Sequence, residues 1–229
     1  MTSLPTALIT GASRGIGLAI ARELEATHNL LLGGRDEQRL KELAATFRSA
    51  EPFTADMSDD EDVERAAKQI AGLDVLVHSA GVATRGPIDQ MSRQQWRDEF
   101  EVNLFAVAQL TTLLLPQLRA TNGQVVLINS GFGLMTLPDN SIYCATKWAL
   151  RAFGDVLREE ERPNGIRVSS IHPGKVDTDM QHDIVEYNGG EYQPELYLKP
   201  ESIAKAVRLA VDATEEATVD MISVRPTRK

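Results

Sequence analysis

Short apolar runs alternate with stretches of helical periodicity along this 229-residue chain, and that alternation limits the folds it can adopt. At Ile16, Ile20 and Leu24, for example, apolar residues recur at helical spacing. The apolar runs themselves predict strands at residues 7–10, 30–33, 74–78, 124–129, 167–172 and 220–224, with 52–54 as a weaker seventh. Strands that alternate with helices form right-handed βαβ units. The sequence therefore predicts an α/β fold of the Rossmann type, a doubly wound sheet of about seven parallel strands with helices on both faces.

Length, charge and cysteine count narrow the class of protein. A chain of 229 residues fits a single domain over residues 1–229. A net charge of −9 argues against binding to nucleic acid or to anionic lipid. The single cysteine forms no internal disulfide, and no Cys/His spacing indicates a metal site. The first ten residues do not resemble a signal peptide, and no run approaches the ~18 apolar residues of a membrane span. We therefore expect a cytoplasmic protein without metal, nucleic-acid or membrane partners.

A glycine-rich segment, TGASRGIG at residues 10–17, lies between the first predicted strand and the first predicted helix. Glycines there allow a tight turn and close backbone approach to a pyrophosphate. The helix start that follows offers free N–H groups and the positive end of the helix dipole. The segment predicts a dinucleotide site that includes Gly11, Ser13, Arg14, Gly15, Ile16 and Gly17.

The end of the second predicted strand bears on which dinucleotide binds. An acidic residue ~20 positions past the glycines would hold the ribose hydroxyls of NAD, and Asp36 meets that count. The strand ends at Gly34, however, and Arg35 follows, whose guanidinium would pair with a 2′-phosphate. Asp36 is better interpreted as the N-cap of the next helix. With Arg14 as a second positive charge, the sequence favours NADP(H) over NAD(H).

Tyr143 and Lys147 are spaced to share one face of a predicted helix. A fixed cation beside a phenol lowers the tyrosine pKa, which would make Tyr143 a usable general acid/base. Ser130 follows the apolar strand at 124–129, at the strand end where open α/β sheets place their sites. Its hydroxyl could donate a hydrogen bond to a substrate oxygen. The alternative interpretation is that Ser130 is only a turn residue at the strand end, beside Gly131.

Several motifs in order together resemble the short-chain dehydrogenase/reductase (SDR) family, in its compact single-domain form. They are TGASRGIG, TADMSD, LDVLVHSAG, FEVNLF, the Tyr143–Lys147 pair and IHPGKVDTDM, and they cover nearly the whole chain. The resemblance implies a catalytic tetrad of Asn103, Ser130, Tyr143 and Lys147. It also implies cofactor contacts, beyond the glycine segment and Arg35, by Asp56, Met57, Ser79, Ala80, Gly81, Tyr143, Lys147, Pro173, Gly174, Val176 and Thr178.

The same resemblance implies the chemistry. Tyr143 would exchange a proton with the substrate oxygen, Ser130 would polarise it, and Lys147 would lower the tyrosine pKa and hold the nicotinamide ribose. Asn103 would support a water of the proton relay through the helix backbone. The expected protein is an NADP(H)-dependent oxidoreductase that interconverts a carbonyl and a secondary alcohol on a small molecule. The alternative is a catalytically idle protein of the same fold that senses NADP(H).

Two departures from the family pattern stand out. His78-Ser79 replaces two asparagines that usually precede Ala80-Gly81, and His78 is either a hydrogen-bonded structural histidine or, less favoured, an extra proton shuttle. Cys144 follows Tyr143 directly, and a helical neighbour points away by ~100°, so a buried side chain is favoured over a redox switch.

Residues 179–200 form an irregular polar stretch where a helix would be expected, which indicates a substrate lid or a surface excursion. Side chains that could line an apolar substrate pocket are Met180, Tyr187, Tyr192, Tyr197, Phe132, Leu134 and Met135. SDR relatives assemble through the helices around Asn103 and Tyr143. Apolar residues at 104–118, Trp148, Leu150 and Phe153 fit a homodimer or homotetramer, or simple core packing.

Overall fold

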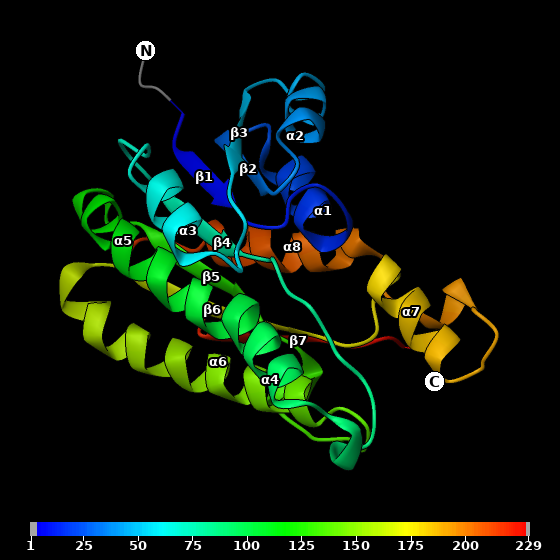
Figure 1. Ribbon diagram of the computed structural model, residues 1–229. Coiled ribbons are helices and arrows are strands. Elements are labelled where there is room, and N and C mark those ends of the chain that lie inside the picture. The colour runs from blue at the N-terminus through cyan, green and yellow to red at the C-terminus, as the bar shows by residue number, and fades with distance from the viewer. Residues whose placement is uncertain (1–3, 228–229) are drawn as a thin grey trace.

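Seven parallel strands form one sheet in the order β3-β2-β1-β4-β5-β6-β7 (Figure 1). The computed structural model describes residues 4–227. The strands are β1 (Thr6–Ile9), β2 (Asn29–Gly34), β3 (Ala50–Thr54), β4 (Val75–His78), β5 (Gln124–Ile128), β6 (Arg167–Pro173) and β7 (Met221–Val224). Each predicted strand is present, and no end differs from the prediction by more than two residues. The predicted Rossmann-type fold class is confirmed.

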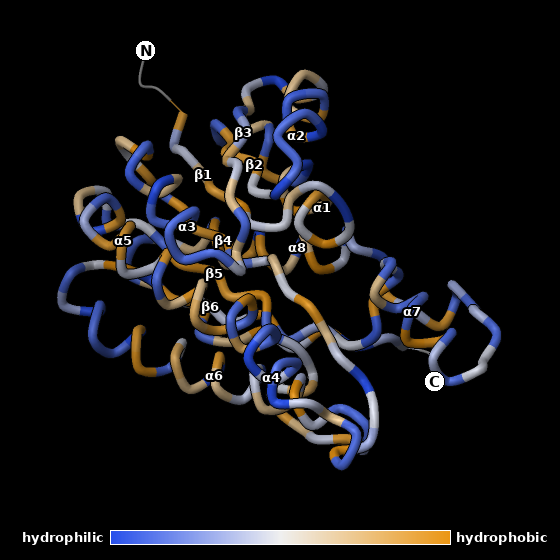
Figure 2. The backbone as a smooth tube through the Cα atoms, viewed as in Figure 1, coloured by the Kyte–Doolittle hydropathy of each residue, from blue (hydrophilic) through white to orange (hydrophobic). Residues whose placement is uncertain are grey.

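Helices cover both faces of the sheet. One apolar core lies between the sheet and α1 (Gly15–Leu24), α2 (Glu37–Ala44) and α8 (Pro200–Val211). A second core lies on the other face, under α3 (Asp60–Ala67), α5 (Ala106–Thr121) and α6 (Ser141–Glu161), with α4 (Arg93–Phe100) packed beside α6. Figure 2 shows hydrophobic residues along the central strands and hydrophilic residues on the outer helix faces. Within residues 4–227, no helix is both long and apolar enough to cross a bilayer.

Asp36 caps the helix that follows β2, as the sequence predicted. Its side chain accepts a hydrogen bond from the Arg39 backbone N–H at 3.0 Å. The carboxylate therefore points back along α2 and satisfies one of the free amides of its first turn.

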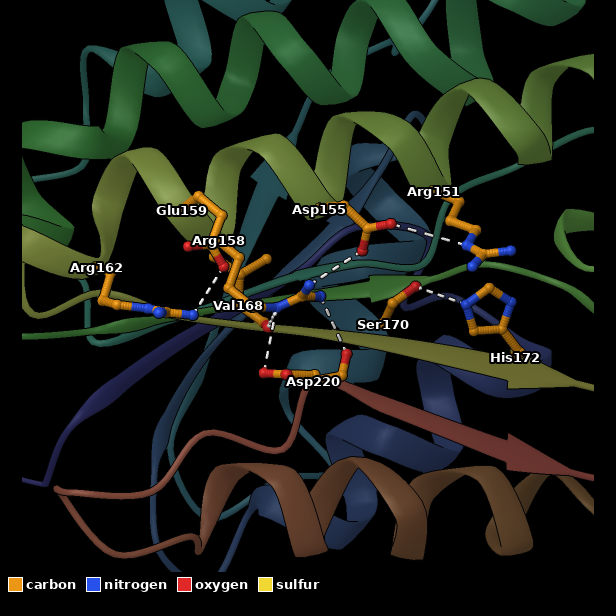
Figure 3. A network of polar contacts seen from close by, with 9 residues as sticks. All are labelled: Arg151, Asp155, Arg158, Glu159, Arg162, Val168, Ser170, His172 and Asp220. Atoms are coloured by element: carbon orange, nitrogen blue, oxygen red, sulfur yellow. Dashed lines mark hydrogen bonds and ion pairs between the residues drawn. The ribbon is translucent and has the colours of Figure 1, made fainter.

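Arg158 joins α6 to the last two strands (Figure 3). Its guanidinium donates to the Val168 carbonyl at 2.9 Å, to the Asp220 carbonyl at 3.1 Å and to the Asp155 carboxylate at 3.0 Å. The side chain is only 10% exposed. Asp155 lies on α6 itself, whereas the two carbonyls belong to β6 and to the residue before β7, so this one side chain fixes β7, at the edge of the sheet, against α6.

The stretch at 179–200 is partly helical, so the prediction of an irregular segment is wrong for its first half. Asp179–Tyr187 forms α7, which ends where Gly189 adopts a φ of +63°. Only Gln181 of this helix is buried, so its sequence lacks the apolar periodicity by which helices are found. After it, Tyr192 donates a hydrogen bond to the Asp177 carboxylate at 2.6 Å and stacks on His182, which fastens the segment to α7.

Candidate functional site

A cleft of about 320 Å³ opens at the carboxyl ends of β1, β2, β3 and β4. Parallel strands end together at this edge, which is why residues far apart in sequence meet there. The predicted cofactor residues that line it are Gly11, Ser13, Arg14, Gly15, Ile16, Gly17, Arg35, Asp56, Met57, Ser79, Ala80, Gly81 and Thr178. Sequence reasoning missed Thr10, Gly33, Gly34, Ala55, Ser58, Val82, Val102, Asp179 and Met180, most of which lie within two residues of a predicted one.

The glycine segment forms the floor of this cleft and leaves no room for side chains. Gly11 has a φ of +66°, and a Cβ there would lie 2.9 Å from the Cα of Ala80. A Cβ on Gly17 would overlap the carbonyl of Gly11. No side chain caps α1 at its start, so its first amides remain available at the cleft. This arrangement of exposed backbone and helix N-terminus fits an anionic phosphate group.

Thr10 ties the glycine segment to the end of β4. Its hydroxyl oxygen accepts hydrogen bonds from the backbone N–H groups of Ser79 and Ala80, at 3.0 and 3.1 Å. The two sides of the cleft are therefore fixed to each other. The only sequence signal for this role was the position of Thr10 at a strand end.

The two arginines predicted to bind a 2′-phosphate both lie at the cleft and both face a carboxylate. Arg35 is 77% exposed and lies 3.8 Å from Asp56. Burial alone would raise the pKa of Asp56, but hydrogen bonds from Ser58 and the charge of Arg35 lower it below its ordinary value. Arg14 pairs with Asp179 at 2.7 Å, across the cleft at the start of α7.

Ser130, Tyr143 and Lys147 come together past the end of β5. The Ser130 hydroxyl accepts a hydrogen bond from the Phe132 N–H at 3.1 Å and also hydrogen bonds the Tyr143 phenol. The Lys147 ammonium lies 5.6 Å from the centre of the Tyr143 ring and donates to the Ile128 carbonyl at 3.2 Å. The predicted triad is thus one contiguous group.

The pKa of Tyr143 departs from the sequence prediction. Burial of the phenol raises the pKa of Tyr143 to about 12, and the hydrogen bond from Ser130 offsets this only in part. Burial lowers the pKa of Lys147 to about 8. The prediction that Lys147 brings the tyrosine pKa toward neutrality is therefore wrong for the protein alone, because desolvation dominates and the cation that lowers the pKa of Tyr143 is Arg85.

Asn103 lies in a π-helical turn, Glu101–Phe105, that links α4 to α5. The turn separates α4 from α5 and breaks the regular helical hydrogen-bond spacing between them. The Asn103 side chain binds both the N–H and the carbonyl of Val82, each at 2.9 Å, and donates to Thr146 at 3.2 Å. With the side chain fully engaged, only the opened backbone of the π turn is left for a water.

His172 is a residue near the site to which sequence reasoning gave no role. It is fully buried, and one ring nitrogen lies 2.9 Å from the Ser130 carbonyl. The other lies 3.0 Å from the Ser170 hydroxyl, a contact that Figure 3 shows. Burial lowers the pKa of His172, which favours the neutral ring. The histidine therefore helps to hold the Ser130 backbone in position.

The two departures from the family pattern are both buried. His78 is 3% exposed and its Nε2 lies 2.9 Å from the Thr111 hydroxyl. Burial lowers the pKa of His78 to about 3, which suits a neutral structural histidine. Cys144 is also buried. Five residues that the resemblance places against the cofactor do not line the cleft, namely Tyr143, Lys147, Pro173, Gly174 and Val176. Pro173 and Val176 are buried, and Gly174 packs against Pro226.

Comparisons with known proteins show the family and the fold. The family model described as short chain dehydrogenase matches residues 5–189. Dehydrogenase/reductase SDR family member 11 of Mus musculus is 32% identical, covering 97% of this chain and 94% of its own length. The structure of an alcohol dehydrogenase from Thermococcus sibiricus, complexed with 5-hydroxy-NADP, is 30% identical with a TM-score of 0.89, covering 99% of this chain and 98% of its own. A metagenomic short-chain oxidoreductase in complex with NADP is 30% identical with a TM-score of 0.83, covering 99% of each chain.

Proposed function

The chain belongs to the short-chain dehydrogenase/reductase family, and on that premise we propose that it is an NADP(H)-dependent oxidoreductase that interconverts a carbonyl and a secondary alcohol. The observation that carries the proposal is the contiguous group of Ser130, Tyr143 and Lys147 next to a cleft built for a dinucleotide. When bound, the nicotinamide supplies or accepts the hydride.

Tyr143 is the general acid/base of this proposal. With its pKa raised to about 12 by burial, the phenol is protonated at neutral pH and can donate its proton to the oxygen of a carbonyl substrate. Ser130, already hydrogen bonded to the phenol, orients that oxygen through its hydroxyl. In this protonation state Tyr143 carries the proton that the reduction direction requires.

Lys147 and Asn103 complete the proposed tetrad. The Lys147 ammonium is anchored on the Ile128 carbonyl and lies beside Gly81, which lines the cleft. A Cβ on Gly81 would lie 3.3 Å from the Asn103 amide oxygen and 3.8 Å from the Lys147 ammonium, so both residues reach the edge of the cleft there. The π turn at Asn103 exposes backbone to a water that would renew the proton.

NADP(H) is the proposed cofactor because Arg35, directly after β2, and Arg14, in the glycine segment, both line the cleft and could pair with a 2′-phosphate. Asp36 offers no carboxylate to the ribose, since it caps α2. The relatives from Thermococcus sibiricus and from a metagenome were solved with NADP compounds, which supports the same choice.

We also propose that the protein is a homodimer or homotetramer that associates through α5 and α6. Three large side chains on or next to these helices are exposed, namely Phe105, Trp148 and Val156. Light scattering tests this, and a monomer at micromolar concentration would contradict it.

The test of the proposed function is oxidation of NADPH, and separately NADH, against a panel of ketones and aldehydes. We expect turnover with NADPH. Arg35→Gln should weaken the binding of NADPH about 10- to 100-fold, because a charge-assisted hydrogen bond to the 2′-phosphate is lost. The binding of NADH should be unchanged. Arg162→Gln, a matched change at an exposed arginine paired with Glu159, should alter neither. Equal use of both cofactors by the unmodified enzyme would contradict the preference, and tight cofactor binding without turnover of any carbonyl would favour the sensing alternative.

A further inference from the structure

Arg85 lies on the segment between β4 and α4, and contacts on both sides fix its position. On one side, the Thr84 N–H donates to the Glu99 carboxylate at 2.7 Å. On the other, the Gly86 N–H donates to the Asp139 carbonyl at 3.0 Å, and Gly86 forms a bridge with Asn140, the residue before α6. Tyr143 stands in the first turn of α6. These backbone contacts therefore place Arg85 beside the proposed catalytic tyrosine.

The Arg85 guanidinium has no partner among residues 4–227. Its Nε is buried without a hydrogen bond, and the side chain forms no ion pair with the carboxylates of the described chain. Burial lowers the pKa of Arg85, whereas the phenols of Tyr143 and Tyr187 raise it. The side chain is therefore partly buried, with its charge near the two phenols and the Glu99 carboxylate, next to the phenol that would act on the substrate.

Glu99 does not serve as the missing partner. Glu99 is only 1% exposed. One of its carboxylate oxygens accepts the hydrogen bond from the Thr84 N–H, and the other has no hydrogen-bond partner among the described residues. Glu99 lies one helical turn before Asn103, which binds Val82 in the same segment. Both side chains hold the 82–84 segment in place, so Glu99 positions the loop and leaves the guanidinium of Arg85 free.

A partly buried guanidinium whose Nε has no hydrogen-bond partner is less stable than a paired one, and a bound anion would supply the missing partner. We propose that Arg85 binds a carboxylate of the substrate, so that the preferred substrates of the proposed reductase are oxo acids and the corresponding hydroxy acids. The planar guanidinium fork matches a carboxylate in a bidentate contact. A phosphate would need more positive charge than one arginine with Glu99 behind it provides.

This inference rests on the proposed function and is tested with matched substrates. A series of oxo acids of increasing chain length is reduced beside the methyl ester of each. We expect kcat/KM for the best acid to exceed that for its ester by about 10- to 100-fold, as a charge-assisted hydrogen bond allows. Arg85→Gln should remove this preference through a higher KM for the acid, with the ester unchanged. Arg85→Lys should retain part of it, and Arg162→Gln should retain all of it.

Two results would overturn the proposal. One is an unmodified enzyme that prefers the esters. The other is an Arg85→Gln enzyme that loses activity on acids and esters equally, since that would mean that Arg85 acts only through Tyr143.

A binding measurement separates failure of this proposal from failure of the proposed function. With NADPH present, hexanoate should raise the melting temperature of the unmodified protein and leave that of Arg85→Gln unchanged. The shift in melting temperature is expected even if the enzyme reduces no carbonyl. In that case the proposed function fails, but the carboxylate-binding site at Arg85 is still supported. The same shift in both proteins, or in neither, contradicts the site.

Discussion

His78 makes the stability of this protein depend on pH in a way that can be calculated from its burial. The ring is 3% exposed, and its pKa falls from 6.5 to about 3 in the folded protein. The unfolded chain therefore takes up a proton as the pH falls below 6.5, while the folded protein stays neutral until about pH 3. The sign follows directly: stability is fully present above pH 6.5 and is lost as the pH falls toward 3.

The linkage relation gives the size of the effect. Between about pH 7 and about pH 5, a group with these two pKa values removes about 2 kcal/mol from the free energy of unfolding. Urea unfolding at the two pH values measures this difference for the unmodified protein and for His78→Asn. We expect the pH-dependent loss to be smaller by about 2 kcal/mol in the variant, whatever its absolute stability. His28 and His172, whose pKa values burial also lowers, contribute equally to both proteins.

His182→Asn is the matched control, because its side chain is 55% exposed. Its pH-dependent loss should equal that of the unmodified protein. If His78→Asn and the unmodified protein lose stability equally, within about 0.5 kcal/mol, the histidine is not held neutral in the fold and the reasoning from burial is refuted.

Two further predictions concern buried charge. Glu99→Gln keeps an oxygen for the neighbouring loop but removes a charge that raises the pKa of Tyr143, so the basic limb of the pH–kcat/KM profile for reduction should move to lower pH; a profile that stays in place would contradict this. Arg158→Gln should lower the free energy of unfolding by about 3 kcal/mol, because it leaves the Val168 carbonyl and a second carbonyl without their donor. In the control Arg162→Gln, urea unfolding should show that the free energy of unfolding falls by less than about 0.5 kcal/mol. Equal losses in the Arg158 and Arg162 variants would argue against the role of the Arg158 hydrogen bonds.

The strands were predictable because burial makes their sequences continuous. All five residues of β5 are buried, and such a run, bounded by turn residues, has few other interpretations. The Asp36 cap was equally local, since an N-cap and the amide it satisfies lie three residues apart. Where the residues that determine a feature lie within a few positions of one another, the sequence was sufficient to predict that feature.

The features that escaped prediction depend on distant partners or on a weak pattern. α7 buries one side chain, so its helical period is not visible in its apolar residues. The pKa of Tyr143 depends on how deeply its hydroxyl is desolvated, and the spacing to Lys147 does not report that. Arg85 became a candidate only once the contacts of Thr84 with Glu99 and of Gly86 with Asp139 had placed it.

The most direct test of the central claim is Tyr143→Phe, which removes one hydroxyl and keeps the ring packed against Phe132. NADPH binding, followed by titration of its fluorescence, and reduction of the best carbonyl are measured on the same samples. The proposed mechanism predicts unchanged binding and a fall in kcat of about 100- to 10,000-fold, the usual contribution of a general acid. A variant that binds NADPH normally and still reduces the carbonyl within a few-fold of the unmodified rate would contradict it.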